Sequence, residues 1–127
     1  MFTLRLKTSR AVEARDITAD VAGLVGGQEC RIVHVYTPHT TCGIMINEHA
    51  DPDVVRDVLE GLERLAPKDY PYRHREGNSD AHLKAAIIGS SVTIPYSEGR
   101  MMLGTWQGIF FMEFDGPRER KVIVNLA

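Results

Sequence analysis

Hydrophobic and polar residues alternate at both ends of the chain, which is the pattern of strands with one buried face. Residues 2–7 place Phe2, Leu4 and Leu6 on one side, because successive side chains of a strand point to opposite faces. From residue 91 onward, apolar runs are separated by short turns, and we expect strands at residues 92–95, 101–104, 107–114 and 120–126. Short turns imply that neighbouring strands run antiparallel.

Three segments between these strands have helical spacing. Residues 17–25 carry apolar side chains at positions i, i+4, i+7 and i+8, which indicates a short amphipathic helix. A second helix should start at Asp51-Pro52-Asp53, where a capping carboxylate precedes a proline, and end near residue 65. A third should be capped by Asn78 or Ser79 and run to Gly89, with one face formed by His82, Ala85, Ala86 and Gly89. Residues 29–36 and 43–46 complete the pattern as strands.

These elements predict an α+β fold in one domain over residues 1–127, with a largely antiparallel, sandwich-like sheet and about three helices. The length suits one domain, since domains cluster at roughly 100–150 residues. The hydrophobic fraction of 43% and the charged fraction of 25% are those of a globular protein. Two cysteines, Cys30 and Cys42, are too few for a disulfide framework, so we expect reduced thiols.

Charge and hydropathy exclude several classes of partner. No apolar run approaches the roughly 18 residues of a membrane helix, and the N-terminal residues lack the charged start and apolar core of a signal peptide. We therefore expect a cytoplasmic protein that does not bind membranes. A net charge of −2 without a dense basic cluster argues against nucleic-acid binding. Small molecules are the expected partners.

Three histidines, His39, His74 and His82, lie in or beside loops and helix starts. Imidazole is a common zinc ligand, and a catalytic zinc typically has three protein ligands. We therefore expect these three to bind a divalent metal, with zinc as the first candidate. The alternative is that they cap, hydrogen-bond or face solvent, because their spacing matches no zinc signature. His34, among apolar residues, is expected to be structural, and His49 to be exposed or to support a neighbouring group.

Polar residues gather at the starts of the second and third helices. Unpaired N–H groups at a helix start attract anions, so we expect Asn78 and Ser79 to bind a substrate phosphate. Glu48, Glu76 and Asp80 are the carboxylates placed to orient a histidine or to transfer a proton, and we take them as the catalytic candidates. The alternative for residues 76–80 is an ordinary capped helix.

Two further segments are candidates for substrate contact. Glycines flank Thr105, Trp106 and Gln107, and a glycine within a strand often marks the close approach of a ligand. We expect these three to contact substrate, with Trp106 stacking and Gln107 hydrogen bonding, although Trp106 can equally serve packing. Arg118 follows a turn and can hold a phosphate with two parallel hydrogen bonds, or can simply be solvated.

Five ordered motifs combine these residues: residues 39–43 (HTTCG), 47–53 (NEHADPD), 74–82 (HREGNSDAH), 104–108 (GTWQG) and 113–118 (EFDGPR). Together they resemble the YjbQ-like family, also called the secondary thiamine-phosphate synthase family, over nearly the whole chain. The resemblance implies an α+β domain built on antiparallel sheet and a homotrimer with sites near subunit boundaries. It also implies weak coupling of a hydroxymethylpyrimidine diphosphate to a thiazole phosphate, with release of pyrophosphate.

Two functions follow as expectations. The first is a small cytoplasmic enzyme whose histidine-centred metal and phosphate site acts on a phosphorylated substrate. The second is a trimeric metal- or small-ligand-binding protein without turnover. A trimer would also cover the strand edges of the C-terminal half. Cys42 is not expected to be a nucleophile, because such a cysteine needs a lowered pKa beside a basic partner.

Overall fold

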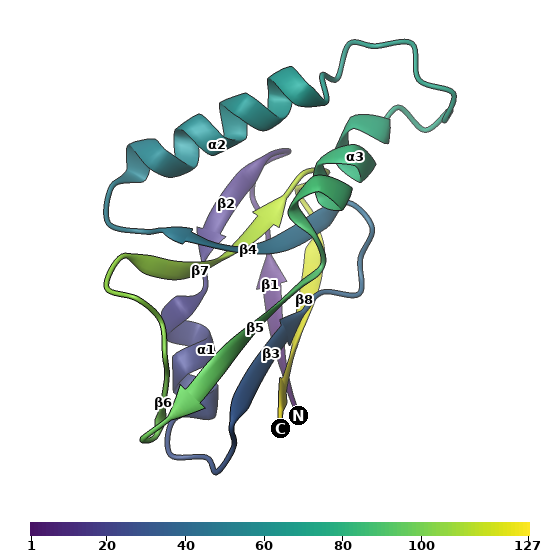
Figure 1. Cartoon of the computed structure of the whole chain (residues 1–127). Coiled ribbons are helices and arrows are strands. Elements are labelled where there is room, and N and C mark those ends of the chain that lie inside the picture. The colour runs from purple at the N-terminus through teal and green to yellow at the C-terminus, as the bar shows by residue number, and fades with distance from the viewer.

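The structure is a computed structural model that describes residues 1–127, with eight strands and three helices (Figure 1). The strands are β1 (Phe2–Lys7), β2 (Glu13–Asp16), β3 (Ile32–Tyr36), β4 (Cys42–Glu48), β5 (Ser91–Ser97), β6 (Arg100–Met101), β7 (Gln107–Glu113) and β8 (Glu119–Leu126). The helices are α1 (Thr18–Val25), α2 (Pro52–Leu65) and α3 (Ser79–Ile88). None of the helices combines the length and the apolar character needed to cross a membrane.

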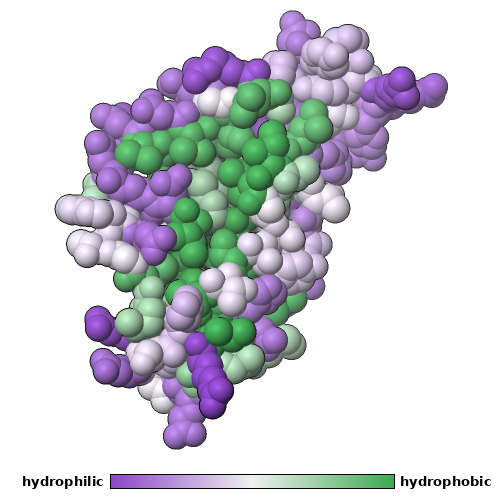
Figure 2. All heavy atoms as spheres, in the orientation of Figure 1, coloured by the Kyte–Doolittle hydropathy of each residue, from purple (hydrophilic) through white to green (hydrophobic).

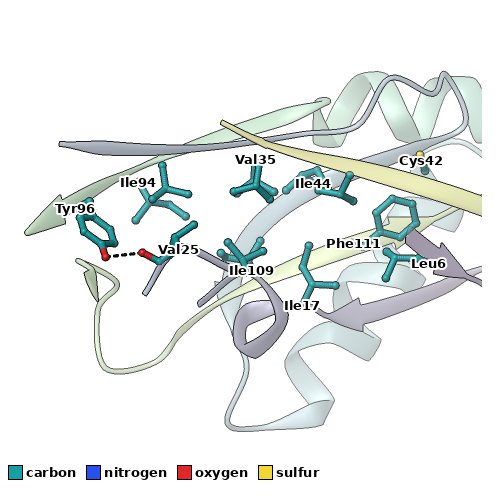
Figure 3. Packing of buried hydrophobic residues seen from close by; sticks show 14 residues of the cluster. Leu6, Ile17, Val25, Val35, Cys42, Ile44, Ile94, Tyr96, Ile109 and Phe111 are labelled. Carbon is teal, nitrogen blue, oxygen red and sulfur yellow. Dashed lines mark hydrogen bonds between the residues drawn. The ribbon is translucent and has the colours of Figure 1, made fainter. Parts of the chain in front are cut away.

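The strands form two antiparallel sheets. One has the order β1-β8-β3-β5-β6 and the other β2-β7-β4. The main hydrophobic core lies between them and is closed at one side by α1. Figure 3 shows Val35 of the larger sheet facing Ile109 of the smaller one, with Tyr96 donating to the carbonyl of Val25 at 2.7 Å. The expected α+β fold with a sandwich-like antiparallel sheet and three helices is confirmed.

Helices α2 and α3 cover the outer face of the three-stranded sheet (Figure 1). A second cluster joins them to it, formed by Met45, Leu62, Ala81, Ala85, Phe110, Met112 and Phe114. The end of α3 approaches β4 closely because Gly43 has no side chain: a Cβ there would lie 2.7 Å from the carbonyl oxygen of Gly89. The start of α2 is as expected, since Asp51 Oδ1 accepts from the N–H of Asp53 at 2.9 Å.

Two expectations about these elements are wrong, and a third holds only in part. Strand β2 was not expected, because its sequence Glu-Ala-Arg-Asp lacks apolar alternation; its pairing with β7 holds it in place. The third helix buries Ala81, Lys84 and Ala85 and leaves Ala86 exposed, so its packed face is turned from the expected one. Asn78 occupies the N-cap position of this helix as expected, but its side chain makes no capping hydrogen bond. The side-chain amide of Asn78 is used elsewhere, in the cavity described below.

Candidate functional site

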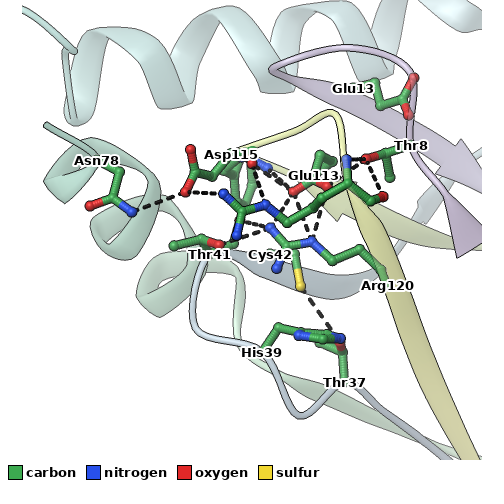
Figure 4. A network of polar contacts seen from close by, with 12 residues as sticks. Thr8, Glu13, Thr37, His39, Thr41, Cys42, Asn78, Glu113, Asp115 and Arg120 are labelled. Atoms are coloured by element: carbon green, nitrogen blue, oxygen red, sulfur yellow. Dashed lines mark hydrogen bonds and ion pairs between the residues drawn. The ribbon is translucent and has the colours of Figure 1, made fainter. Parts of the chain in front are cut away.

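A polar cavity of about 300 Å³ lies where the start of α3 meets the β3–β4 and β7–β8 connections. Its lining contains no hydrophobic residue: Pro38, His39, Thr40, Thr41, Glu76, Asn78, His82, Asp115, Arg118 and Arg120. Figure 4 shows how the Arg120 and Asp115 side chains from the β7–β8 region meet Thr41 and Asn78 from the other two segments. Three of the five motifs found in the sequence, residues 39–43, 74–82 and 113–118, contribute to this lining or to the groups beneath it.

A buried ion pair forms the floor of this cavity. Glu113, at the end of β7, is fully buried, and Arg120 of β8 is 2% exposed at its side chain. The guanidinium of Arg120 donates to both carboxylate oxygens of Glu113, through Nε at 3.0 Å and through Nη2, and also to Thr41 Oγ1 at 2.8 Å. Burial is the largest single influence and opposes the charge on Arg120, but the hydrogen bond to Glu113 and the nearby negative charges together raise the pKa of Arg120. The pair ties the loop before β4 to the β7–β8 connection.

Asp115 links the two sides of the cavity. It accepts from Arg118 Nη2 at 3.0 Å and from Asn78 Nδ2 at 2.9 Å, both at Oδ2. These bonds fix the Asn78 amide, whose Oδ1 is buried and has no hydrogen-bond partner. Arg118 remains half exposed, and because a guanidinium has five N–H donors, it retains donors beyond the two used on Asp115.

His39 reaches the cavity from the β3–β4 connection. Its Nε2 accepts from the backbone N–H of Lys121 at 3.1 Å, so in the neutral ring the proton resides on Nδ1. Burial, followed by the positive charges of Arg120 and Lys121, lowers the pKa of His39. The ring is therefore held as a neutral hydrogen-bond donor. A metal would reach it only after the ring turned or lost the Nδ1 proton.

His74 and His82 meet beside the cavity. Their ring centroids are 5.4 Å apart and the rings are nearly perpendicular. Together with Ser79 they line a hollow next to the cavity, and His82 lines both. Glu76 Oε2 lies 3.7 Å from His74 Nε2. The chain nevertheless contains no group of three His, Cys, Asp or Glu side chains arranged to hold a metal ion, so the expected third ligand, His39, is not brought into one set with the other two.

The remaining carboxylates expected to be catalytic lie elsewhere. Asp80 is 7% exposed at its side chain and pairs with Lys84 Nζ at 3.2 Å. Lys84, almost completely buried, also donates to Glu63 of α2 at 2.5 Å, and this hydrogen bond lowers the pKa of Glu63. Asp80 thus joins α3 to α2 through a lysine. Glu48 lies opposite Gln107 in the sheet and does not line the cavity.

The segment Thr105–Gln107 is also distant from the cavity. Trp106 directly precedes β7 and Gln107 begins it, whereas Glu113 ends that strand and Asp115 follows it. A strand rises about 3.3 Å per residue, which places the two ends of β7 about 20 Å apart. Trp106 is 63% exposed, and Gln107 Oε1 accepts from the N–H of Gly104 at 2.8 Å. Within one chain these residues cannot contact a ligand held at Arg118.

Sequence reasoning missed the buried polar residues that support the site, Thr41, Lys84, Glu113 and Arg120. A signal for the ion pair was present: Glu113 and Arg120 carry opposite charges and flank the turn at residues 115–117, which brings the end of one strand close to the start of the next. Lys84 gave a weaker signal, as a cation four residues after Asp80 on a helix.

Comparison with known proteins identifies close relatives over the full length. Residues 2–127 match the family described as UPF0047 protein YjbQ-like. A UPF0047 protein of Methanocaldococcus jannaschii is 45% identical over 99% of this chain and 93% of its own length. The Bacillus subtilis UPF0047 protein YugU is 44% identical over 98% and 96%. A crystal structure of a YjbQ/UPF0047 protein from Clostridium acetobutylicum has a TM-score of 0.96 at 50% identity, covering both chains completely.

Proposed function

The chain belongs to the YjbQ-like UPF0047 family, and from its geometry we propose that the polar cavity binds a small phosphorylated ligand together with a divalent cation. The proposed reaction is displacement of diphosphate. The example that we take is the coupling of a hydroxymethylpyrimidine diphosphate to a thiazole phosphate, which is the reaction that the family resemblance implies. In this reaction the carbon–oxygen bond to the diphosphate breaks, a carbon–nitrogen bond to the thiazole forms, and pyrophosphate leaves.

The unpaired oxygen of Asn78 is the observation that carries this proposal. A buried acceptor without a partner destabilises a protein by about 1–3 kcal/mol, and Asn78 Oδ1 is such an atom. The Asn78 amide cannot turn to satisfy it without losing the bond from Nδ2 to Asp115. A ligand hydroxyl or a cation would supply the missing partner.

The donors around Asn78 suit a phosphate group. His39 offers Nδ1–H, because its Nε2 is occupied by the Lys121 N–H. Arg118 offers its remaining guanidinium N–H groups beside Asp115. Hydrogen bonds from ionised donors to phosphate oxygens are among the stronger ones in proteins. Both side chains would stabilise the negative charge that builds on a departing diphosphate.

The cation would be held by His74 and His82. Two imidazoles with rings 5.4 Å apart fit the preference of zinc for nitrogen ligands, and phosphate oxygens would complete the set. When bound, the cation would neutralise charge on the phosphate. Glu76, close to His74, is the one carboxylate among the three catalytic candidates that remains at the cavity.

A second copy of the chain would bring Thr105–Gln107 to the ligand. The family resemblance implies a homotrimer with sites near subunit boundaries, and two features of the surface support it. Leu83 and Ile87 of α3, near the cavity, are 44% and 53% exposed. Figure 2 shows apolar side chains gathered in a broad band across one face, and large exposed apolar patches mark interaction sites. Light scattering should report a mass near three chains, and a monomer at all concentrations would contradict this.

Metal analysis tests the cation site. We expect zinc bound to the untagged protein in a ratio near one per chain, and His74→Ala or His82→Ala to remove it. His34→Ala is the matched control, because His34 lies in β3 and stacks on Tyr36 away from the cavity. Binding that is absent, or that persists in both variants, would contradict the assignment.

The alternative function is a trimeric protein that binds the same ligands without turnover. The position of Asp80 favours it, because Asp80 is committed to Lys84 and only Glu76 remains for proton transfer. Glu76→Gln separates the two functions. If the protein is an enzyme, the Glu76→Gln variant should no longer release pyrophosphate from the substrates but should keep its affinity for inorganic pyrophosphate. A binding protein should release no pyrophosphate from a hydroxymethylpyrimidine diphosphate and a thiazole phosphate even before the substitution.

A further inference from the structure

A second cavity, of about 510 Å³, lies between α2 and the edge strand β2. It shares no lining residue with the polar cavity. Its volume is within the roughly 300–1,000 Å³ range of small-molecule sites. One part of its lining is apolar, formed by Val12, Ala14, Pro52, Val55, Leu59 and Phe110, and the other is polar, with Asp16 and His49 among its members.

A chain of hydrogen bonds orients the His49 ring at this cavity. The N–H of Ile109 donates to Thr18 Oγ1 at 2.8 Å, and Thr18 Oγ1 donates to Asp16 Oδ1 at 2.5 Å. Asp16 Oδ1 also accepts from the N–H of Thr18 at 2.9 Å, and Oδ2 lies 2.9 Å from His49 Nδ1. In the neutral ring this contact places the proton on Nδ1. Nε2 is then an acceptor with no partner in the chain.

The backbone also fixes His49. Its N–H donates to the carbonyl of Trp106 at 3.0 Å. Its ring lies directly against Gly108, where an added Cβ would overlap Nδ1, Cγ and Cβ of the imidazole. The glycine at position 108 therefore makes the space that the ring occupies. Side-chain and backbone contacts together hold this imidazole in one orientation, as a preorganised binding group requires.

Some charged side chains of the cavity already have a hydrogen-bond or ion-pair partner within the chain, and one does not. Glu13 accepts from the N–H and hydroxyl of Ser9, Asp51 caps α2, and Arg56 pairs with Asp53. Arg10 makes no side-chain hydrogen bond or ion pair. The cavity thus offers one free cation, one free acceptor and an apolar wall.

We propose that this cavity is a binding site for a small hydroxy acid that also carries an apolar group, for example an aromatic ring. The carboxylate of the ligand pairs with Arg10, its hydroxyl donates to His49 Nε2, and its body packs against Val55, Leu59 and Phe110. Asp16 acts as a positioning residue through His49. The two cavities share no lining residue, so mandelate binding here and pyrophosphate binding at the polar cavity are tested separately.

Mandelate is a suitable probe because it carries a phenyl ring, a hydroxyl and a carboxylate. The full chain is titrated with it while amide shifts are followed by NMR. Phenylacetate, which lacks the hydroxyl, and benzyl alcohol, which lacks the carboxylate, serve as matched ligands. We expect saturable mandelate binding with shifts at Arg10, His49 and Val55, and affinities for the other two ligands that are weaker by about tenfold or more.

Variants test the assigned contacts. Arg10→Gln and His49→Phe should each weaken mandelate binding by about tenfold, and His49→Phe keeps a ring over Gly108. Asp16→Asn should weaken it less and raise the fraction of His49 protonated at Nε2, which ¹⁵N shifts of the ring report. Arg100→Gln, in β6, is the control and should bind as the parent does. Equal affinity for mandelate and phenylacetate, unchanged binding by Arg10→Gln and His49→Phe, or no saturable shift would overturn the proposal.

Discussion

Replacing Glu113 with Gln should destabilise the protein more than almost any other single change. The substitution keeps the shape of the side chain and removes its charge. Arg120, 2% exposed at its side chain, then becomes a buried cation without a counter-ion. Breaking a buried ion pair in this way lowers the free energy of unfolding by about 3–5 kcal/mol. Since domains of this kind are stable by only about 5–15 kcal/mol, a large share of the stability should be lost.

The contacts of the pair allow a graded series. Thr41→Val removes one hydroxyl acceptor of Arg120 and should lower the free energy of unfolding by about 1–3 kcal/mol, the effect of one unsatisfied buried group. Glu119→Gln alters an exposed carboxylate on β8 that makes no ion pair, and should change it by less than about 0.5 kcal/mol.

Urea unfolding followed by far-ultraviolet circular dichroism measures the series. Trp106 fluorescence is a poor choice, because Trp106 is already exposed in the folded state. The expected order of destabilisation is Glu113→Gln, then Thr41→Val, then Glu119→Gln. A loss below about 1 kcal/mol for Glu113→Gln would refute the reasoning, since it would mean that Arg120 finds water or another partner.

Four further outcomes follow from the contacts described above. Lys84→Met removes the cation between two carboxylates and should lower the free energy of unfolding by about 3–5 kcal/mol in urea titrations. The pKa of His39 lies below 6.5 in the folded state. The contribution of the neutral ring to the free energy of unfolding should therefore be fully present above about pH 6.5 and be lost as the pH falls toward the folded pKa. His39→Gln should flatten this dependence in urea titrations across that range. Burial raises the pKa of the Cys42 thiol, so mass spectrometry after brief alkylation should find Cys30 modified first. Ser79→Ala should change the unfolding free energy by less than about 0.5 kcal/mol, because Ser79 caps no helix.

The helices and strands could be predicted from the sequence where the local pattern of residues alone determines them. The alternation of residues 2–7 is borne out by a register that faces Leu4 against Val122, and Asp51 caps its helix as expected. The convergence of His39 and His82 on one cavity also follows from loops that meet at one end of the sheets. Strand β2 did not follow, because pairing with β7 rather than its own residues makes it a strand.

Long-range pairing explains what the sequence could not reveal about the site. Lys84 and Glu113 are charged residues among apolar neighbours, and such residues are almost never fully buried unless they are paired. Glu63, the partner of Lys84, is on α2 and 21 residues away along the chain. Arg120, the partner of Glu113, is on β8 and only 7 residues away, so this pair alone left a signal in the sequence. Asp80 was expected to orient a histidine or to transfer a proton, because it begins the helix that carries His82, but its pairing with Lys84 directs it toward α2 instead.

Calorimetric titration of the full chain with inorganic pyrophosphate tests the proposed phosphate site most directly. The parent protein should show saturable binding, and Arg118→Gln should weaken it by about tenfold through loss of one charged donor. Arg31→Gln, at an exposed position outside the cavity, should bind as the parent does. Absence of saturable heat in the parent, or equal affinity in the Arg118 variant, would contradict the account.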